Sequence, residues 1–96
     1  MKLNILPSAR DDLARGFDFY EAQGEGLGTY FLESLFSDID SLMSYAGIHR
    51  KVFGFHRSLS NRFPYAIYYS VESETVFVSG VLDCRRDPAW VRERLK

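Results

Sequence analysis

The expected fold depends mainly on one segment, Arg62 to Pro88, which reads RFPYAIYYSVESETVFVSGVLDCRRDP. It contains two apolar runs on either side of the polar residues 72–74, and it ends in Arg-Arg-Asp-Pro. Runs rich in aromatic and β-branched residues that flank a polar turn are typical of paired β-strands. We therefore predict one strand from Arg62 to Val71 and a second from Thr75 to Leu82.

The second of these strands is predicted to lie in the middle of a sheet, because it is apolar on both faces. Strict alternation places on one face Val76, Val78, Gly80 and Leu82, and on the other face Phe77 and Val81. Pro64 cannot donate a hydrogen bond to a neighbouring strand, so it belongs at a strand start or at an unpaired edge.

The N-terminal half begins with a short alternating strand, Lys2 to Leu6, which Pro7 ends. A helix is predicted next, with Ser8 as its N-cap and Asp11 three residues later in a weak capping box. Apolar residues then recur at helical spacing up to about Ala22; they are Leu13, Phe17 and Tyr20.

The residues from Gly24 to Gly28 interrupt this helical pattern with three glycines. A dinucleotide-binding loop would require a strand before the glycines, and here a helix precedes them, so we predict a tight helix–helix bend. A second helix follows from Leu27 to Tyr45, ending near Gly47. Its broad apolar stripe consists of Leu27, Phe31, Leu35, Ile39 and Leu42, widened by Leu32, Phe36 and Met43.

A strand is predicted from Val52 to Leu59, with a possible bulge at Gly54. A final helix begins with Asp87 as cap and Pro88 as its first residue, and carries Trp90. The predicted order is β-α-α-β-β-β-α over a single domain, residues 1–96. We expect an α+β fold in which a helical hairpin packs on a small, mainly antiparallel, twisted sheet.

The composition is that of a small globular domain: 96 residues, 46% hydrophobic and 16% aromatic. The single Cys84 excludes an internal disulfide bond and fits a reducing compartment. The N-terminus lacks the apolar region of a signal peptide, and no apolar run reaches membrane-spanning length. We expect a cytoplasmic protein that does not contact a membrane.

The net charge is −1, but the two halves of the chain differ in sign. Residues 1–48 carry three basic and eight acidic residues, whereas residues 49–96 carry nine basic and five acidic ones. The second half therefore allows a basic face. We predict a cationic surface for phosphate or an acidic partner, built from Arg57, Arg62, Arg85 and Arg86. The alternative is that Arg86 pairs with Asp83 or Asp87 and only supports the final helix.

His56 could act as an acid or a base near neutral pH, or be a surface residue without a role. His49 has a still weaker case. Two histidines and one cysteine give no metal-ligand spacing, so we expect no metal and no cofactor. Tyr65, Tyr68 and Tyr69 could stack on bases, although alternation allows only some of them onto one face.

The order and spacing of several segments resemble the RelE/ParE family, the toxins of bacterial type II toxin–antitoxin pairs. The resemblance covers nearly the whole chain. Its marks are Ala9 to Leu13, Phe19-Tyr20-Glu21, Gly26-Leu27-Gly28 with Phe31-Leu32, Phe63-Pro64-Tyr65 with Ile67-Tyr68-Tyr69, and Val81-Leu82-Asp83 with Arg85-Arg86-Asp87-Pro88.

The family contains two kinds of toxin. RelE-like members are ribosome-dependent messenger-RNA endonucleases; they carry a mid-strand arginine where this chain has Ala66 and a tyrosine where it has Val91, although Arg85 matches their strand-end arginine. ParE-like (plasmid stabilisation) members instead inhibit DNA gyrase by binding it, and the Phe-Pro-Tyr and Arg-Arg-Asp-Pro segments are more similar to theirs. The resemblance therefore favours a ParE-like toxin that acts by binding, with an endoribonuclease as the alternative.

The resemblance implies a cognate antitoxin as partner and DNA gyrase as target, with the ribosome and messenger RNA as the alternative target. The target-binding surface would be the four arginines. In a nuclease, the catalytic candidates would be Arg85, Arg62, Arg57 and His56. An inactive family member is a third possibility, and a dimer or a toxin–antitoxin hetero-oligomer is possible in each case.

Overall fold

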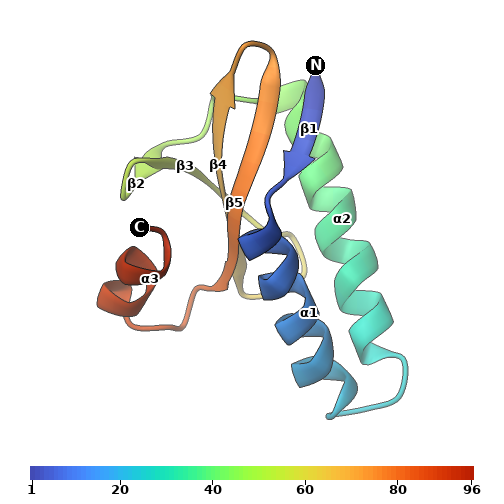
Figure 1. Ribbon diagram of the computed structural model, residues 1–96. Coiled ribbons are helices and arrows are strands. Elements are labelled where there is room, and N and C mark those ends of the chain that lie inside the picture. Colours follow the sequence, from blue (N-terminus) through green and yellow to red (C-terminus); the bar gives the residue numbers. More distant parts are fainter.

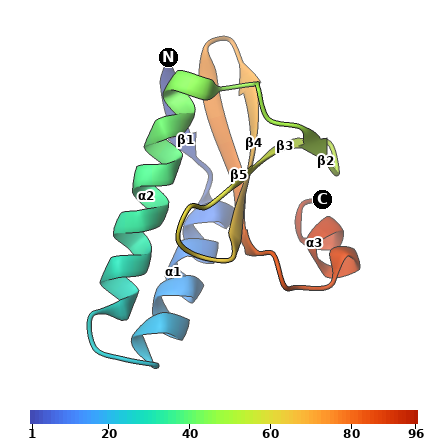
Figure 2. The same ribbon diagram turned by 180° about the vertical axis from the view of Figure 1, so that it is seen from behind.

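The computed structural model describes residues 1–96. Its elements are β1 (Lys2–Ile5), α1 (Pro7–Glu21), α2 (Leu27–Tyr45), β2 (Lys51–Val52), β3 (Phe55–Leu59), β4 (Tyr65–Glu72), β5 (Thr75–Asp83) and α3 (Pro88–Arg94). The strands form one sheet in the order β1-β5-β4-β3-β2, and only the β1–β5 pair is parallel. The α1–α2 hairpin covers one side of the sheet and α3 lies on the other (Figures 1 and 2). The predicted α+β architecture is confirmed, with one strand more than expected.

The helical hairpin agrees with the prediction, and α2 has the predicted bounds. Gly26 adopts a φ of 86°, which a glycine reaches without steric cost. The carboxylate of Glu21 accepts hydrogen bonds from the backbone N–H groups of Gly26 (3.1 Å) and Gly28 (2.9 Å). A Cβ atom on Gly28 would lie 2.6 Å from the ring of Phe17, so the helices approach closely at this point. The glycine cluster is therefore a helix–helix bend.

The predicted N-cap of α1 is wrong. The helix begins at Pro7 with Leu6 as N-cap, and no side chain caps it. Proline suits the first helical position because its φ is already helical and its missing N–H would have no partner there. Ser8 lies inside the helix, where its hydroxyl donates to the carbonyl of Ser79 in β5 at 3.2 Å.

The predicted strand from Val52 to Leu59 is a hairpin of two strands, β2 and β3, so the bulge expected at Gly54 is wrong. Phe53 and Gly54 have φ values of 55° and 86°. Two consecutive residues with positive φ form the tight turn whose twist matches a β-hairpin. The turn was not predicted because Phe53 is aromatic, and an aromatic residue rarely adopts a positive φ.

The strand predicted from Arg62 begins three residues later, at Tyr65. Pro64 has no N–H to donate, and the N–H of Tyr65 instead closes a tight turn on the carbonyl of Phe63 at 2.7 Å. The preceding residues are held by Asp38 of α2, whose carboxylate accepts from the Ser60 hydroxyl (2.6 Å) and the Asn61 side-chain amide (2.9 Å).

A β-bulge in β5 changes which residues share a face. Tyr68 pairs with Gly80 and Tyr69 with Val78, so Ser79 is an extra residue. One extra residue reverses the alternation beyond it. The prediction that Gly80 and Leu82 share a face with Val76 and Val78 is therefore wrong.

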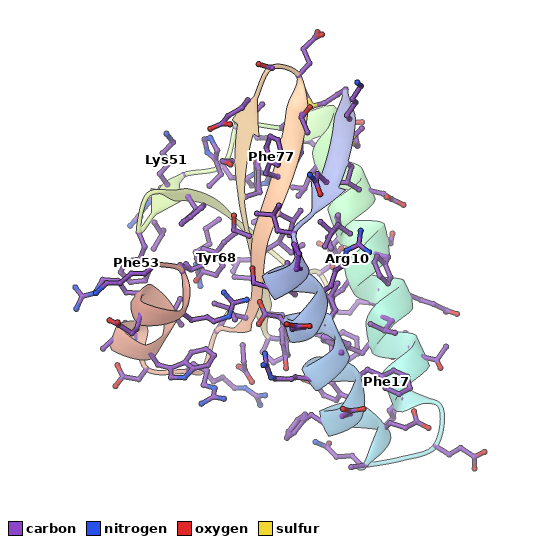
Figure 3. The ribbon with its side chains drawn as sticks, in the orientation of Figure 1. Arg10, Phe17, Lys51, Phe53, Tyr68 and Phe77 are labelled. Carbon is purple, nitrogen blue, oxygen red and sulfur yellow. The ribbon has the colours of Figure 1, made fainter.

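The sheet is buried on both sides, and each side has its own apolar cluster. The hairpin-side cluster consists of Ala9, Leu13, Phe31, Leu35, Ile39, Leu42, Tyr65, Ile67, Tyr69, Val76, Val78 and Val81. The α3-side cluster consists of Ala66, Tyr68, Leu82, Val91 and Leu95. Tyr68 lies on this second side, between the sheet and α3 (Figure 3). The predicted start of α3 is confirmed, because Asp87 accepts from the N–H of Ala89 at 2.9 Å and Pro88 is the first residue.

Leu35 and Phe36 are neighbours in α2 with opposite environments: Leu35 is 0% exposed and Phe36 is 43% exposed. Leu35→Ala should lower the free energy of unfolding by about 2–5 kcal/mol, because it leaves a cavity against the sheet. Phe36→Ala is the matched control and should cost less than about 1 kcal/mol. The measurement is denaturant unfolding, and equal losses in the two variants would contradict the hairpin's orientation.

Candidate functional site

The four arginines of the predicted surface lie in β3, in the β3–β4 loop and directly after β5. Arg57 lies in β3, and its Nη2 is 3.6 Å from the sulfur of Cys84, directly before Arg85 and Arg86. Arg62 lies in the β3–β4 loop, 5.9 Å from the ring centre of Tyr30 in α2. Because Arg57 contacts the residue directly before Arg85 and Arg86, these three residues at the end of β5 are named the arginine surface. Arg62 stays a predicted member of the surface.

Arg85 is held by Asp83 two residues before it. Its Nε and Nη2 donate to the two carboxylate oxygens at 2.9 and 2.7 Å, and its backbone N–H donates to Oδ1 at 2.8 Å. These bonds favour the charged carboxylate and hold the pKa of Asp83 below its ordinary value of 3.8. The guanidinium has a fixed direction, but part of its charge is compensated.

The partner of Arg86 is neither Asp83 nor Asp87, the two carboxylates considered from the sequence. Its guanidinium carbon lies 4.0 Å from the ring centre of Trp90 in α3, a cation–π contact. No ion pair joins it to Asp83 or Asp87. Stacking holds the guanidinium against the ring and leaves its N–H groups available for an acceptor.

Arg57 is half-buried on the α3 side of the sheet, where its Nε donates to the hydroxyl of Tyr68 at 3.2 Å. Tyr68 is 3% exposed. Of the three tyrosines considered for base stacking, none is available as a flat surface, because Tyr65 and Tyr69 are also buried.

His56 lies on the opposite face of the sheet from Arg57, because successive residues of a strand point to opposite sides. Its Nδ1 is 2.6 Å from the carbonyl oxygen of His49, and its ring stacks on Tyr69 with centres 5.1 Å apart. The hydroxyl of Tyr69 also bonds the His49 ring at 2.5 Å and accepts from the N–H of Gly47 at 3.1 Å. His56 thus belongs to a cluster that joins the end of α2 to β3 and β4.

A groove between α1 and α3 lies next to the arginine surface, and sequence reasoning missed it. Its volume is about 590 Å³. The residues that line this α1–α3 groove are Asp12, Arg15, Gly16, Phe19, Tyr65, Val81, Leu82, Asp83, Arg86 and Trp90. Phe19 is 51% and Trp90 39% exposed, although both are large aromatic residues. Only the fold brings these two residues together, so no local sequence pattern could have indicated the groove.

Asp12 lies at the base of this groove, with 4% of its side chain exposed. It accepts from the backbone N–H of Val81 at 3.0 Å and from Arg94 of α3 through Nη2 at 2.5 Å and Nε at 3.2 Å. Burial raises the pKa of Asp12, while these hydrogen bonds and the charge of Arg94 oppose the rise. Sequence reasoning did not identify Asp12 as a site residue.

No three His, Cys, Asp or Glu side chains are grouped to hold a metal ion. No helix has the length and apolar character that crossing a membrane requires.

A search of the solved structures finds a chain described as belonging to the chromosomal ParDE TA system from P. aeruginosa. The two chains superpose with a TM-score of 0.74 and are 19% identical, over 84% of this chain and 92% of that one. At this identity the match shows the fold, and it confirms the ParE-like fold that the sequence predicted. No protein-family model and no curated protein matches the sequence.

The Asp83–Arg85 pair predicts a specific pH dependence. A carboxyl whose pKa is lowered in the folded state stabilises the fold above its ordinary value of 3.8 and loses this contribution as the pH falls below it. Asp83→Asn should therefore lower stability more at pH 7 than at about pH 3, because the contribution of the pair shrinks as the pH falls below 3.8. Denaturant unfolding across this range measures the difference, with the exposed Asp40→Asn as control. A difference that is the same at both pH values would contradict the pairing.

Proposed function

We propose that this protein is the toxin of a type II toxin–antitoxin pair, held inactive by an antitoxin and acting by binding DNA gyrase. The observation that carries the proposal is the fold shared over 84% of the chain with a chain of a ParDE TA system. The Phe63-Pro64-Tyr65 and Arg85-Arg86-Asp87-Pro88 segments support the ParE-like branch by resemblance.

The α3-side cluster supports binding rather than messenger-RNA cleavage. Ala66 and Val91 stand where the resemblance places the arginine and the tyrosine of nuclease relatives. Both are buried in the same apolar cluster, with exposed fractions of 0% and 5%. Charged or phenolic groups for proton transfer are thus absent from these positions, and the space is filled by packing between the sheet and α3. A gyrase-binding toxin needs a shaped surface and no such groups.

The arginine surface supplies that shape and charge. Arg85 is fixed by Asp83 and Arg86 by Trp90, so both present guanidinium groups whose side-chain freedom is already reduced. Ordered cations lose less entropy when they bind an acidic surface or a phosphate. Arg57 extends this surface across β3.

Induced expression of the chain should stop growth, and the purified chain should inhibit gyrase supercoiling while leaving transcripts intact in a reconstituted translation reaction. Arg57→Gln with Arg85→Gln should raise the concentration needed for inhibition by about tenfold or more. The control is Arg50→Gln, which removes an exposed arginine whose side chain makes no hydrogen bond or ion pair. Because Arg57 is partly buried, its replacement could affect folding, and melting curves are recorded to test whether each variant folds.

Transcript cleavage at defined codons with supercoiling unaffected would contradict gyrase as the target and make Arg85 a candidate for stabilising phosphate charge. Unchanged toxicity in the folded double variant would remove the arginine surface from either mechanism. A chain that inhibits neither process, yet binds the product of the adjacent gene, would be the inactive family member.

A further inference from the structure

We infer that the α1–α3 groove is the docking site for an acidic segment of a partner protein, which inserts an apolar side chain between Phe19 and Trp90. Carboxylates on either side of that side chain bind Arg15 and Arg86. The inference rests on the proposed function only in taking the antitoxin as the partner; the chemistry of the groove identifies an acidic amphipathic segment whatever its source.

The shape of the groove suits a side chain rather than a flat contact. Its volume of about 590 Å³ lies in the range of sites that enclose a ligand. Half of the residues that line it are hydrophobic. The aromatic rings of Phe19 and Trp90 remain exposed on its two walls, and aromatic residues at the centre of a concave surface are common anchors of protein interfaces.

The charges of the groove select an acidic partner. Each of its two carboxylates already binds an arginine: Asp12 binds Arg94 and Asp83 binds Arg85. Two further arginines, Arg15 and Arg86, line the groove. Arg15 is 3.6 Å from Asp12, but 74% of its side chain is exposed. Together with Arg85 and Arg94, which pair with its two carboxylates from outside the lining, the groove has four arginines and two aspartates, in a chain whose net charge is −1.

The same features argue against nucleic acid as the occupant. Nucleic-acid binding relies on cations that follow several phosphates. Here only two arginines, Arg15 and Arg86, line the groove, and half of the lining is apolar. A segment that combines one apolar anchor with flanking acids matches both parts of the lining.

Trp90 makes occupation of the groove directly measurable, because it is the only tryptophan in the chain. The full chain is titrated with two probes while Trp90 emission is recorded. The first is the product of the adjacent gene, with any tryptophan replaced by phenylalanine, and the second is a synthetic amphipathic peptide of glutamate, leucine and phenylalanine. The controls are the same peptide with lysine in place of glutamate and a single-stranded RNA oligonucleotide.

Both acidic probes should shift Trp90 emission saturably, and the lysine peptide should not. Arg15→Glu with Arg86→Glu should weaken binding by about tenfold or more, whereas Arg50→Glu with Lys51→Glu should change it by less than about twofold. Phe19→Ala should also weaken binding, with the exposed Phe36→Ala as its matched control. Melting curves establish that each variant folds.

The outcomes separate this inference from the proposed function. If the adjacent gene's product forms a complex, but Trp90 emission is unchanged and the Arg15/Arg86 variant binds as the wild type does, the groove inference is overturned and the toxin proposal stands. If that product does not bind but the acidic peptide occupies the groove, the toxin–antitoxin proposal fails and the groove inference stands. Failure of both acidic probes, or tighter binding of the RNA, overturns the groove inference.

Discussion

The buried carboxylate of Asp12 is the interaction on which the arrangement of the elements depends. Strand β1 pairs with β5 only as far as Ile5 and Val78, so the edge of β5 beyond that point has no neighbouring strand. The first turns of α1 take the place of a strand there. Ser8 donates to the carbonyl of Ser79, and Asp12, four residues later on the same helix face, accepts from the N–H of Val81.

Asp12 also connects α1 to α3, because its carboxylate binds the guanidinium of Arg94. Arg94 additionally donates to the carbonyl of Ser8 at 2.8 Å. A carboxylate this deeply buried is costly unless it is paired and hydrogen-bonded, and here its oxygens have both kinds of partner. The position of α3 follows from this contact and from the packing of Val91 and Leu95 on the sheet. Trp90 lies in α3 and Arg86 in the loop before it. The positions of the α1–α3 groove and of part of the arginine surface therefore depend on the contact between Asp12 and Arg94.

The sequence predicted the elements that depend on periodicity and missed those that depend on tertiary contacts. The centre of the α2 stripe, from Phe31 to Leu42, and the Asp87–Pro88 start of α3 are local patterns, and both are confirmed. Leu27 and Phe36 were predicted to belong to the stripe and are exposed. The bulge at Ser79 and the turn at Phe53 contradict the local pattern, because pairing with a neighbouring strand imposes them. The candidate site shows the same division: charge identified the arginines as a group, but their partners, Asp83 for Arg85 and Trp90 for Arg86, depend on geometry. In the sequence, Asp12 is one of several acidic residues of α1. Its role depends on its hydrogen bond to the edge of β5, which only the structure shows.

A double-mutant cycle on Asp12 and Arg94 tests most directly whether this pair holds α3 to the rest of the fold. The variants are Asp12→Asn, Arg94→Met and the combination, and the measurement is the free energy of unfolding, followed by denaturant titration. Arg94→Met leaves the buried carboxylate with only the exposed Arg15, 3.6 Å away, as a cation, and should cost about 3 kcal/mol or more. The account predicts a coupling energy of roughly 1–3 kcal/mol between the two positions, with the double variant losing less than the two single losses combined. A coupling energy below about 0.5 kcal/mol would mean that the two sites are independent and would contradict the central role of this pair.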